Sequence, residues 1–255
     1  MMTEEWRLLQ TGLLSAAENM AIDRAILVAH SKGHVPPTVR LYGWNPAAIS
    51  IGYFQQLTEE VDLTACEKDH IDYVRRITGG GAVFHEDEVT YSFVIQEKHP
   101  QISKNILESY KTICLAIMNG LDFLGVKSTY APINDILVNN KKISGNAQTR
   151  KQKTVLQHGT ILTDVDVDKM FRLLKVPNEK IKGKMIANVK ERVTSLTHEL
   201  GSDFSFEDVS NALKKGFEET FDVTFTTGIL TDEEKTLATS FQKTTFGSKK
   251  WNHQR

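Results

Sequence analysis

Two arginines and three consecutive glycines stand side by side in this sequence, and together they could hold an anion. The segment Arg75–Glu86 reads RRITGGGAVFHE, so that Gly79–Gly81 closely follow Arg75 and Arg76. Consecutive glycines permit positive φ and let a ligand approach backbone N–H groups, which can form a concave nest for phosphate or carboxylate. The guanidinium groups add fixed charge with bidentate reach. We interpret the segment as an anion-binding loop; a glycine-rich hairpin turn with solvated arginines is the alternative.

The residues after the glycines exclude two common nucleotide-binding motifs. No Gly-Lys-Ser/Thr follows, so the loop is not a P-loop. A strand-like run rather than a helix follows, so it is not a dinucleotide fingerprint either. The anion interpretation therefore needs support from another part of the chain.

A second polar segment, Ala131–Leu162, gives that support. Asn134 and Asp135 precede an apolar strand, where a carboxylate could hold Mg²⁺ or a ribose hydroxyl. Lys142 enters a strand beside a Ser-Gly turn, and residues 141–153 hold five basic and no acidic side chains. This group of cations could surround a polyphosphate or an acyl phosphate. A solvated strand face remains the alternative for Lys141.

His158 and the two cysteines are weaker candidates. His158 lies in an apolar run, where a histidine in the core is the commoner outcome. Cys114 falls within a predicted helix and is expected to be buried. Cys66, with His70 four residues on, could form a thiol–imidazole pair, but no loop or glycine turn surrounds it. Two cysteines are too few for a disulfide framework, which favours a reducing compartment.

Hydrophobic periodicity predicts an α+β fold. Hairpins outnumber strand–helix–strand units, so we expect a mixed, largely antiparallel sheet flanked by helices. A capping box at Ser15 and Glu18 predicts a helix start, as do Ser205 and Thr231. Hairpins are predicted for 38–44 with 47–53 and for 82–85 with 89–95. The other expected elements are helices at 16–29, 63–69 and 103–124, strands at 72–76, 135–138, 142–144 and 155–162, and a mostly helical last third.

Composition and charge limit the partners. The 255 residues carry a net charge of -1, with 40% hydrophobic and 25% charged residues, which suits a soluble globular protein. No overall field points to nucleic acid or to a membrane. The N-terminus lacks a signal pattern, so we expect a cytoplasmic protein. No composition shift marks a boundary, and we expect a single catalytic domain over 1–255.

Four blocks of the sequence together resemble the lipoate-protein ligase A family. In chain order they are ENMAIDRAIL, LYGWNPAAISIGYFQ, RRITGGGAVFHE, and INDILVNNKKISGNAQ with LQHGTIL. The resemblance covers nearly the whole chain and implies a biotin/lipoate-protein ligase-like fold. It is closest to short, split ligases that lack the C-terminal accessory domain, which a separate accessory subunit would supply.

The resemblance implies roles for individual residues. Lys142 would be the catalytic lysine that contacts the acyl carboxyl and the α-phosphate, and Arg76 would hold the adenylate phosphate or the carboxylate. Asp135 would bind adenosine phosphates and is the candidate ligand for Mg²⁺. The implied ATP and lipoyl-adenylate set is Arg76, Gly79, Gly80, Gly81, Ala82, Val83, Phe84, Asn134, Asp135, Lys142, Gly145 and His158.

The expected reaction has two steps. Lipoate and ATP, with Mg²⁺, would give lipoyl-adenylate, and a lysine of a lipoyl domain of a 2-oxoacid dehydrogenase or of the glycine-cleavage H protein would then take the lipoyl group. A fixed ammonium at Lys142 would stabilise the negative charge that develops in adenylation. The sequence analysis thus predicts an ATP-dependent lipoate ligase subunit.

Two other functions remain open. One is an octanoyl or lipoyl transferase that moves the acyl group between carrier proteins without ATP; the other is a non-catalytic binder of acylated carriers. Thiol-dependent octanoyltransferases similar to this chain place a cysteine shortly before the lysine block, whereas residues 129–140 contain none. Because a thioester mechanism needs its nucleophile, we expect the ligase.

A basic segment is predicted to guide the carrier. Residues 169–192 hold eight basic and two acidic side chains, including Lys180, Lys182 and Lys184. Lipoyl domains that serve this family tend to be acidic near the target lysine, so the segment could steer their approach. A solvated helical face is the alternative.

Overall fold

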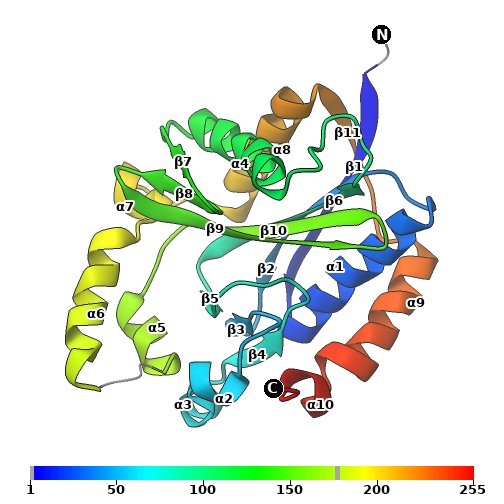
Figure 1. Cartoon of the computed structure of the whole chain (residues 1–255). Coiled ribbons are helices and arrows are strands. Elements are labelled where there is room, and N and C mark those ends of the chain that lie inside the picture. The colour runs from blue at the N-terminus through cyan, green and yellow to red at the C-terminus, as the bar shows by residue number, and fades with distance from the viewer. Residues whose placement is uncertain (1–2, 176–178) are drawn as a thin grey trace.

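The computed structural model describes residues 3–175 and 179–255 and shows an α+β architecture (Figure 1). The strands are β1 Glu4–Leu14, β2 Thr38–Trp44, β3 Ala48–Ile51, β4 Asp72–Arg75, β5 Val83–His85, β6 Glu88–Gln96, β7 Thr129–Ala131, β8 Asp135–Val138, β9 Lys141–Lys151, β10 Thr154–Leu162 and β11 Val223–Thr227. The α-helices are α1 Ala16–Ser31, α2 Leu57–Glu60, α3 Leu63–Lys68, α4 Ile106–Phe123, α5 Val167–Leu173, α6 Glu179–Arg192, α7 Leu196–Leu200, α8 Phe206–Phe221, α9 Asp232–Phe241 and α10 Lys249–Asn252, with a π-helix, η1, at Gln242–Phe246.

A large sheet forms the centre of the molecule, with the strand order β11-β1-β2-β6-β10-β9-β8-β7. The pairings of β1 with β11 and with β2 are parallel, and those from β2 through β7 are antiparallel. The predicted mixed, largely antiparallel sheet is therefore confirmed.

Helices cover both faces of the large sheet (Figure 1). On one face α4 and α8 pack together over a core that includes Phe93, Ile113 and Phe217. On the other, α1 lies against α9 over a second core that includes Ile26 and Val94. Adjacent side chains of a strand point to opposite faces, so each buried strand contributes to both cores.

A small sheet, β4-β3-β5, holds the predicted arginine–glycine loop. The central strand β3 pairs in parallel with β4 and antiparallel with β5, and the loop connects these two outer strands. Arg75, at the end of β4, is fully buried and donates hydrogen bonds to backbone carbonyls of Gln55 and of Asn252 in α10. Arg75 therefore anchors the loop and the C-terminal helix rather than a ligand.

Both predicted hairpins are wrong. β2 pairs with β1 and β6 in the large sheet, whereas β3 belongs to the small sheet. Likewise β5 pairs with β3, and β6 pairs with β2 and β10. All seven residues of β2 and all four of β3 are buried, so each needs neighbours on both edges. Local turn residues could not indicate which distant strands supply those neighbours.

The predicted helix starts are confirmed. Capping boxes form at Ser15 with Glu18, at Ser205 with Asp208 and at Thr231 with Glu234. Each box satisfies N–H groups that a helix leaves unpaired at its first turn.

The basic segment includes α5 and α6, and part of its charge is already paired. Lys169 contacts Glu86, and Lys190 Nζ lies 2.6 Å from Asp168 Oδ2. Residues 176–178, and the side chains of Lys180 and Lys182, lie outside the described part of the chain, so carrier steering stays a prediction. Among the described residues, none of the helices has both the length and the apolarity needed to cross a lipid bilayer.

Candidate active site

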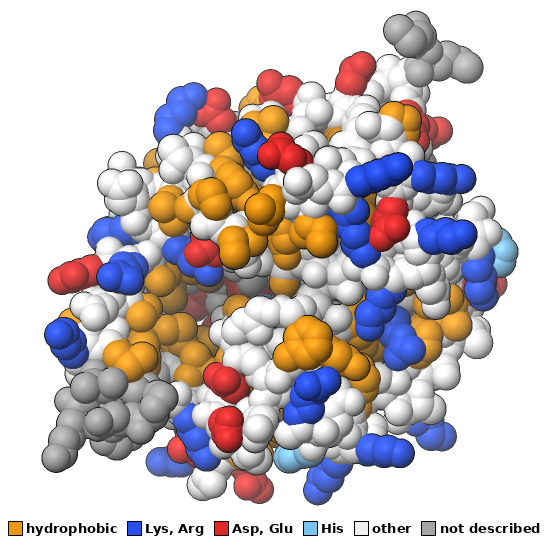
Figure 2. Space-filling view, in the orientation of Figure 1, with side chains coloured by type: hydrophobic (Ala, Val, Ile, Leu, Met, Phe, Trp, Pro, Cys, Tyr) orange, Lys and Arg blue, Asp and Glu red, His pale blue; other side chains and the backbone are white. Residues whose placement is uncertain are grey.

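A cavity of about 150 Å³ opens where the small sheet faces β9 and β10 of the large one. Figure 2 shows this face of the molecule hollowed near its centre, with hydrophobic side chains around the opening. The walls combine apolar, hydroxyl, amide and cationic groups. The lining residues are Met20, Tyr42, Trp44, Ser50, Arg76, Gly80, Gly81, Ala82, Val83, His85, Thr90, Asn134, Lys142, Gly145, Asn146, Ala147, His158, Gly159 and Thr160.

The cavity gathers most of the residues that sequence reasoning selected. Nine of the twelve predicted site residues line it, and Gly79, Phe84 and Asp135 do not. The Gly79 carbonyl instead accepts a hydrogen bond from Arg76, and Phe84 packs in the small core under β3. Two segments that lie more than fifty residues apart in the sequence thus meet at one site.

Lys142, on β9, brings a partly exposed ammonium group to the cavity. Its Nζ lies 2.7 Å from Asp135 Oδ1 on β8, and its side chain is 41% exposed. A Cβ at Gly145 would lie 2.8 Å from both Cε and Nζ of Lys142, so glycine at 145 leaves the space that the lysine side chain occupies. The ammonium is therefore held in place and is still accessible to a ligand.

Arg76 acts as the internal brace of the glycine loop. Its Nε donates to Thr78 Oγ1, its Nη1 to Ser50, and its Nη2 to the carbonyls of Gly79 and Gly81. Burial lowers the pKa of Arg76 to about 10, which leaves it charged near neutral pH. Since these contacts occupy every nitrogen of the guanidinium, direct binding of a phosphate or carboxylate by Arg76 stays a prediction.

The same contacts orient the loop amides. In a trans peptide the C=O and N–H groups point in opposite directions. The Gly79 and Gly81 carbonyls point to Arg76 at 2.8 and 2.7 Å, so the N–H groups of Gly80 and Ala82 point away from it. Within the described residues, no backbone acceptor pairs with these two N–H groups outside the strands and helices. They are suited to a developing negative charge at the cavity wall.

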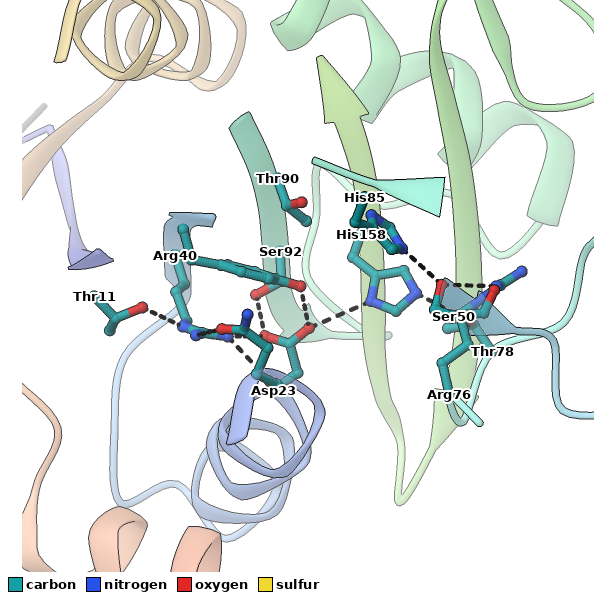
Figure 3. A network of polar contacts seen from close by, with 12 residues as sticks. Thr11, Asp23, Arg40, Ser50, Arg76, Thr78, His85, Thr90, Ser92 and His158 are labelled. Carbon is teal, nitrogen blue, oxygen red and sulfur yellow. Dashed lines mark hydrogen bonds and ion pairs between the residues drawn. The ribbon is translucent and has the colours of Figure 1, made fainter. Parts of the chain in front are cut away.

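His158 belongs to a buried network that reaches α1 (Figure 3). Its Nε2 lies 2.8 Å from Thr78 Oγ1, and its Nδ1 lies 3.3 Å from Asp23 Oδ2. Arg40 Nη1 donates to the other oxygen of Asp23 at 2.8 Å. Burial lowers the pKa of His158. Burial by itself would raise the pKa of Asp23, but the hydrogen bond with His158 and the charge of Arg40 outweigh this effect and hold that pKa below its ordinary value.

His85 belongs to a second buried network, and Figure 3 shows its contact with Ser50. Its Nε2 lies 2.7 Å from Ser50 Oγ, and its Nδ1 lies 2.8 Å from Glu88 Oε1. Trp44 stacks on the imidazole ring at 4.0 Å and also donates its indole N–H to Glu88. The imidazole is fixed in position by its two partners and by the stacked ring.

The sequence analysis did not select several of the buried polar residues in these two networks. Asp23 and Arg40 were assigned only to a predicted helix and strand, and Ser50 and Glu88 were not selected at all. The available signal was burial: charged or hydroxyl side chains in otherwise apolar elements need partners inside the protein. That signal marks these residues without naming their partners.

The residues present do not make a protein-based metal site. No Asp or Glu of the described chain lines the cavity, and Asp135 is paired with Lys142. Among the described residues, groups of three or more His, Cys, Asp or Glu arranged to hold an ion are absent. Magnesium bound through one carboxylate would depend on ligands from a substrate. Magnesium therefore stays a prediction.

Neither cysteine is placed for catalysis. Both are buried, and the cavity lining includes neither. Burial raises the pKa of Cys66 to about 11 and that of Cys114 to about 12. Since the thiolate is the nucleophile, both thiols are unreactive near neutral pH. The predicted burial of Cys114 is confirmed.

Comparison with known families and proteins identifies the relatives of this chain. Residues 15–218 match the lipoyl protein ligase A/B catalytic domain. An octanoyltransferase, LipM, from Brevibacillus brevis is 37% identical and aligns over 99% of this chain and 100% of its own length. LipM from Clostridioides difficile is 39% identical over 91% of this chain and 93% of its own.

Solved structures share the fold. A bipartite lipoate protein ligase from Thermoplasma acidophilum superposes with a TM-score of 0.90 and 32% identity, covering 98% of this chain and 96% of its own. A lipoate-protein ligase A bound with ATP gives a TM-score of 0.85 and 30% identity, with 99% of each chain covered. The predicted lipoate-ligase-like fold is therefore confirmed.

The predicted ATP-dependent ligase function is corrected by these relatives. Curated proteins 34% to 39% identical to this chain, from Brevibacillus brevis to Bacillus subtilis, are named octanoyltransferases. They support the transferase that sequence analysis ranked second. The sequence analysis favoured the ligase because residues 129–140 contain no cysteine, and the likeness of the whole chain to octanoyltransferases outweighs that absence.

Proposed function

Because the chain belongs to the lipoyl protein ligase A/B catalytic family, we propose that it is an ATP-independent acyltransferase of the octanoyltransferase type. It would move an octanoyl or similar medium-chain acyl group from the thioester of one carrier protein to a lysine of another. The acceptor would be a lipoyl domain of a 2-oxoacid dehydrogenase or the glycine-cleavage H protein. The observation that carries this proposal is one cavity in which apolar walls meet the accessible ammonium of Lys142.

The apolar walls suit the acyl chain. Met20, Trp44, Val83 and Ala147 line the cavity and offer it no charge. Removing the surface of each methylene of an acyl chain from water contributes about 0.8 kcal/mol. A medium-length chain therefore binds through many small contributions, which hold its carbonyl carbon at the polar end of the cavity.

Lys142 suits the carbonyl end. Attack on a thioester carbonyl places negative charge on its oxygen, and a fixed ammonium in a partly dry site stabilises that charge most in the transition state. The ion pair with Asp135 keeps Nζ in position without enclosing it. This role needs neither ATP nor a metal ion.

The test is acyl transfer in buffer without ATP. The protein is mixed with an octanoylated acyl carrier protein and an unmodified lipoyl domain, and the mass of the lipoyl domain is measured by mass spectrometry. We expect the domain to gain one octanoyl group. Lys142→Ala should lower the transfer rate by about 10²- to 10³-fold, because it removes one stabiliser of the oxyanion.

Lys141→Ala is the matched control. Lys141 is the neighbouring cation but does not line the cavity, so its loss should leave the rate nearly unchanged. The proposal is wrong if the domain is modified only when free octanoate or lipoate is supplied with ATP. If Lys141→Ala and Lys142→Ala lower the transfer rate equally, Lys142 contributes only positive charge and its position at the cavity does not matter.

We also propose that the protein is cytoplasmic and that residues 1–255 form a single catalytic domain. A separate accessory subunit is a further expectation. Adding such a subunit should leave ATP-independent transfer unchanged if the described cavity is sufficient.

A further inference from the structure

Three side chains from the small sheet and β6 form a continuous hydrogen-bonded row at the cavity wall, and Figure 3 shows the Ser50–His85 part of it. Ser50 Oγ lies 2.7 Å from His85 Nε2, and His85 Nδ1 lies 2.8 Å from Glu88 Oε1. Both Ser50 and His85 line the cavity that Lys142 enters. A hydroxyl, an imidazole and a carboxylate in this order have the geometry of an activated serine.

The partners of Glu88 fix the direction of the hydrogen bonds. The indole N–H of Trp44 can only donate, and it reaches Glu88 Oε1 at 3.1 Å. The Thr90 hydroxyl also donates to this oxygen. Glu88 Oε1 is thus an acceptor, so His85 Nδ1 carries the proton that binds it. His85 Nε2 is then free to accept the proton of Ser50 Oγ, as a general base must.

Arg76 adds a cation beside the hydroxyl. Its Nη1 donates to Ser50 Oγ at 3.1 Å and to the Ser50 carbonyl at 2.9 Å. A guanidinium at this distance stabilises the negative charge that appears on Oγ when its proton leaves. The base and the cation therefore act on the same oxygen from two directions.

The cysteines offer no competing nucleophile. The sequence contains only Cys66 and Cys114, and both are buried away from the cavity lining. A transferase that passes an acyl group through the enzyme needs another atom to carry it. Four residues with hydroxyl groups line the cavity in the described chain: Tyr42, Ser50, Thr90 and Thr160. Ser50 is paired with an imidazole, whereas Thr90 donates to Glu88 and Tyr42 donates to Asp23.

We propose that Ser50 is the nucleophile of the transfer and carries the acyl group as an ester, with His85 as its general base and acid and Glu88 as the positioning residue. This inference rests on the proposed acyltransferase function and replaces the thioester intermediate that a cysteine would form.

The two half-reactions balance without a further reactant. In the first, Ser50 Oγ forms a C–O bond to the acyl carbonyl carbon, its proton moves to His85 Nε2, and the C–S bond breaks. The departing thiolate of the donor takes that proton. In the second, the neutral amine of the acceptor lysine forms a C–N bond, the C–O bond to Ser50 breaks, and the amine proton returns through His85 to Ser50 Oγ.

The glycine loop serves both half-reactions. Each passes through a tetrahedral intermediate with charge on the former carbonyl oxygen. The N–H groups of Gly80 and Ala82 point away from Arg76, and both residues line the same cavity as Ser50. Together with Lys142 they supply donors for that oxygen.

The test is to trap the acyl-enzyme. The protein is mixed with octanoyl acyl carrier protein and no acceptor, and intact mass spectrometry with peptide mapping locates any octanoyl group. We expect one group on the peptide that contains Ser50. Ser50→Ala should remove it and should lower transfer to the lipoyl domain by about 10³-fold or more.

Further variants separate chemistry from folding. Ser50→Cys keeps a nucleophile of similar size, so it should again become acylated, now with a thioester that hydroxylamine cleaves at neutral pH. Cys66→Ala and Cys114→Ala should keep the ester on Ser50. Circular dichroism and thermal unfolding establish that each variant is folded.

The outcomes distinguish the two proposals. An octanoyl group on Cys66 or Cys114, or full transfer activity in folded Ser50→Ala, would overturn the Ser50 proposal and leave the acyltransferase function standing. If the unaltered protein transfers nothing from the thioester, the acyltransferase function itself fails, and Ser50 with it.

Discussion

Two buried networks, each with a hydroxyl, an imidazole and a carboxylate, contact Arg76, and the differences between them indicate which one is suited to catalysis. One joins Ser50, His85 and Glu88; the other joins Thr78, His158 and Asp23. Each places a hydroxyl on one imidazole nitrogen and a carboxylate on the other. Composition alone would therefore assign both the same role.

Their electrostatic partners differ. The Asp23 carboxylate lies 2.8 Å from Nη1 of the buried Arg40 and also accepts from Ser92 and Tyr42. The Glu88 carboxylate has neutral donors, Trp44 and Thr90, beside His85. A carboxylate already neutralised by an arginine stabilises an imidazolium less. The Glu88 network is thus better suited to take a proton from its hydroxyl.

Access differs as well. Ser50 and His85 both line the cavity, whereas Thr78 is fully buried and is not part of the lining. His158 reaches the cavity but presents its Nε2 to Thr78. We therefore infer that the Glu88 network serves catalysis, whereas the Asp23 network joins α1 to the glycine loop.

Glu88→Gln gives the largest expected effect on activity. Trp44, Thr90 and His85 Nδ1 all contact the same oxygen, Glu88 Oε1, so the amide oxygen of Gln can take its place and keep these hydrogen bonds. The variant therefore loses only the negative charge that stabilises the imidazolium of His85 when it takes the proton of Ser50. We expect acyl transfer to fall by about 10²-fold with modest change in stability, measured as transfer rate and urea unfolding. Unchanged activity would remove Glu88 from the mechanism.

Asp23→Asn gives the largest expected effect on stability. It removes the counterion of Arg40, which is fully buried and cannot regain water. Breaking a buried ion pair by loss of one partner costs about 3 to 5 kcal/mol. Urea unfolding measures the loss, with Glu88→Gln as the matched control because Glu88 is hydrogen-bonded to neutral donors rather than to an arginine. A larger loss of stability in the control would reverse the assignment.

The sequence predicted the local elements well because their signals are local. The capping box at Ser15 and the apolar stripe of 103–124 depend on residues a few positions apart, and both helices form. Strand partners depend on distant segments, so both predicted hairpins failed. β1 was not predicted at all, although Trp6, Leu8 and Leu9 in it are buried in the core.

In the site, too, the residues with local sequence signals were predicted and the contacts between distant segments were not. Glycine and lysine motifs indicated the loop and Lys142, because their spacing carries the chemistry. The pairing of Ser50 with His85 joins β3 to β5 through the small sheet, and that of Asp23 with Arg40 joins α1 to β2. Neither pairing has a spacing that a motif could reveal. Only the fold brings these groups within hydrogen-bond distance.

The smallest expected effect is a pH dependence of stability that comes from His158 in the Asp23 network. Burial lowers the pKa of His158, and the positive charge of Arg76 adds to this effect, whereas the hydrogen bond and charge of Asp23 oppose it. Below about pH 6.5 the unfolded chain binds a proton at this position while the folded chain does not, so stability falls as pH drops toward the folded pKa. A tenfold difference in proton affinity between the folded and unfolded chains corresponds to about 1.4 kcal/mol of stability.

His158→Gln tests this effect because it keeps a polar side chain but removes the titration. Urea unfolding of the unaltered protein should show stability falling as the pH drops below about 7, and the variant should show a shallower fall. A folded Ser50→Ala variant, which leaves His158 in place, should keep the full slope. If stability changes equally with pH in the His158→Gln variant and in the unaltered protein, His158 binds its proton equally well in the folded and unfolded chains. The pKa of His158 would then not distinguish the Asp23 network from the Glu88 network.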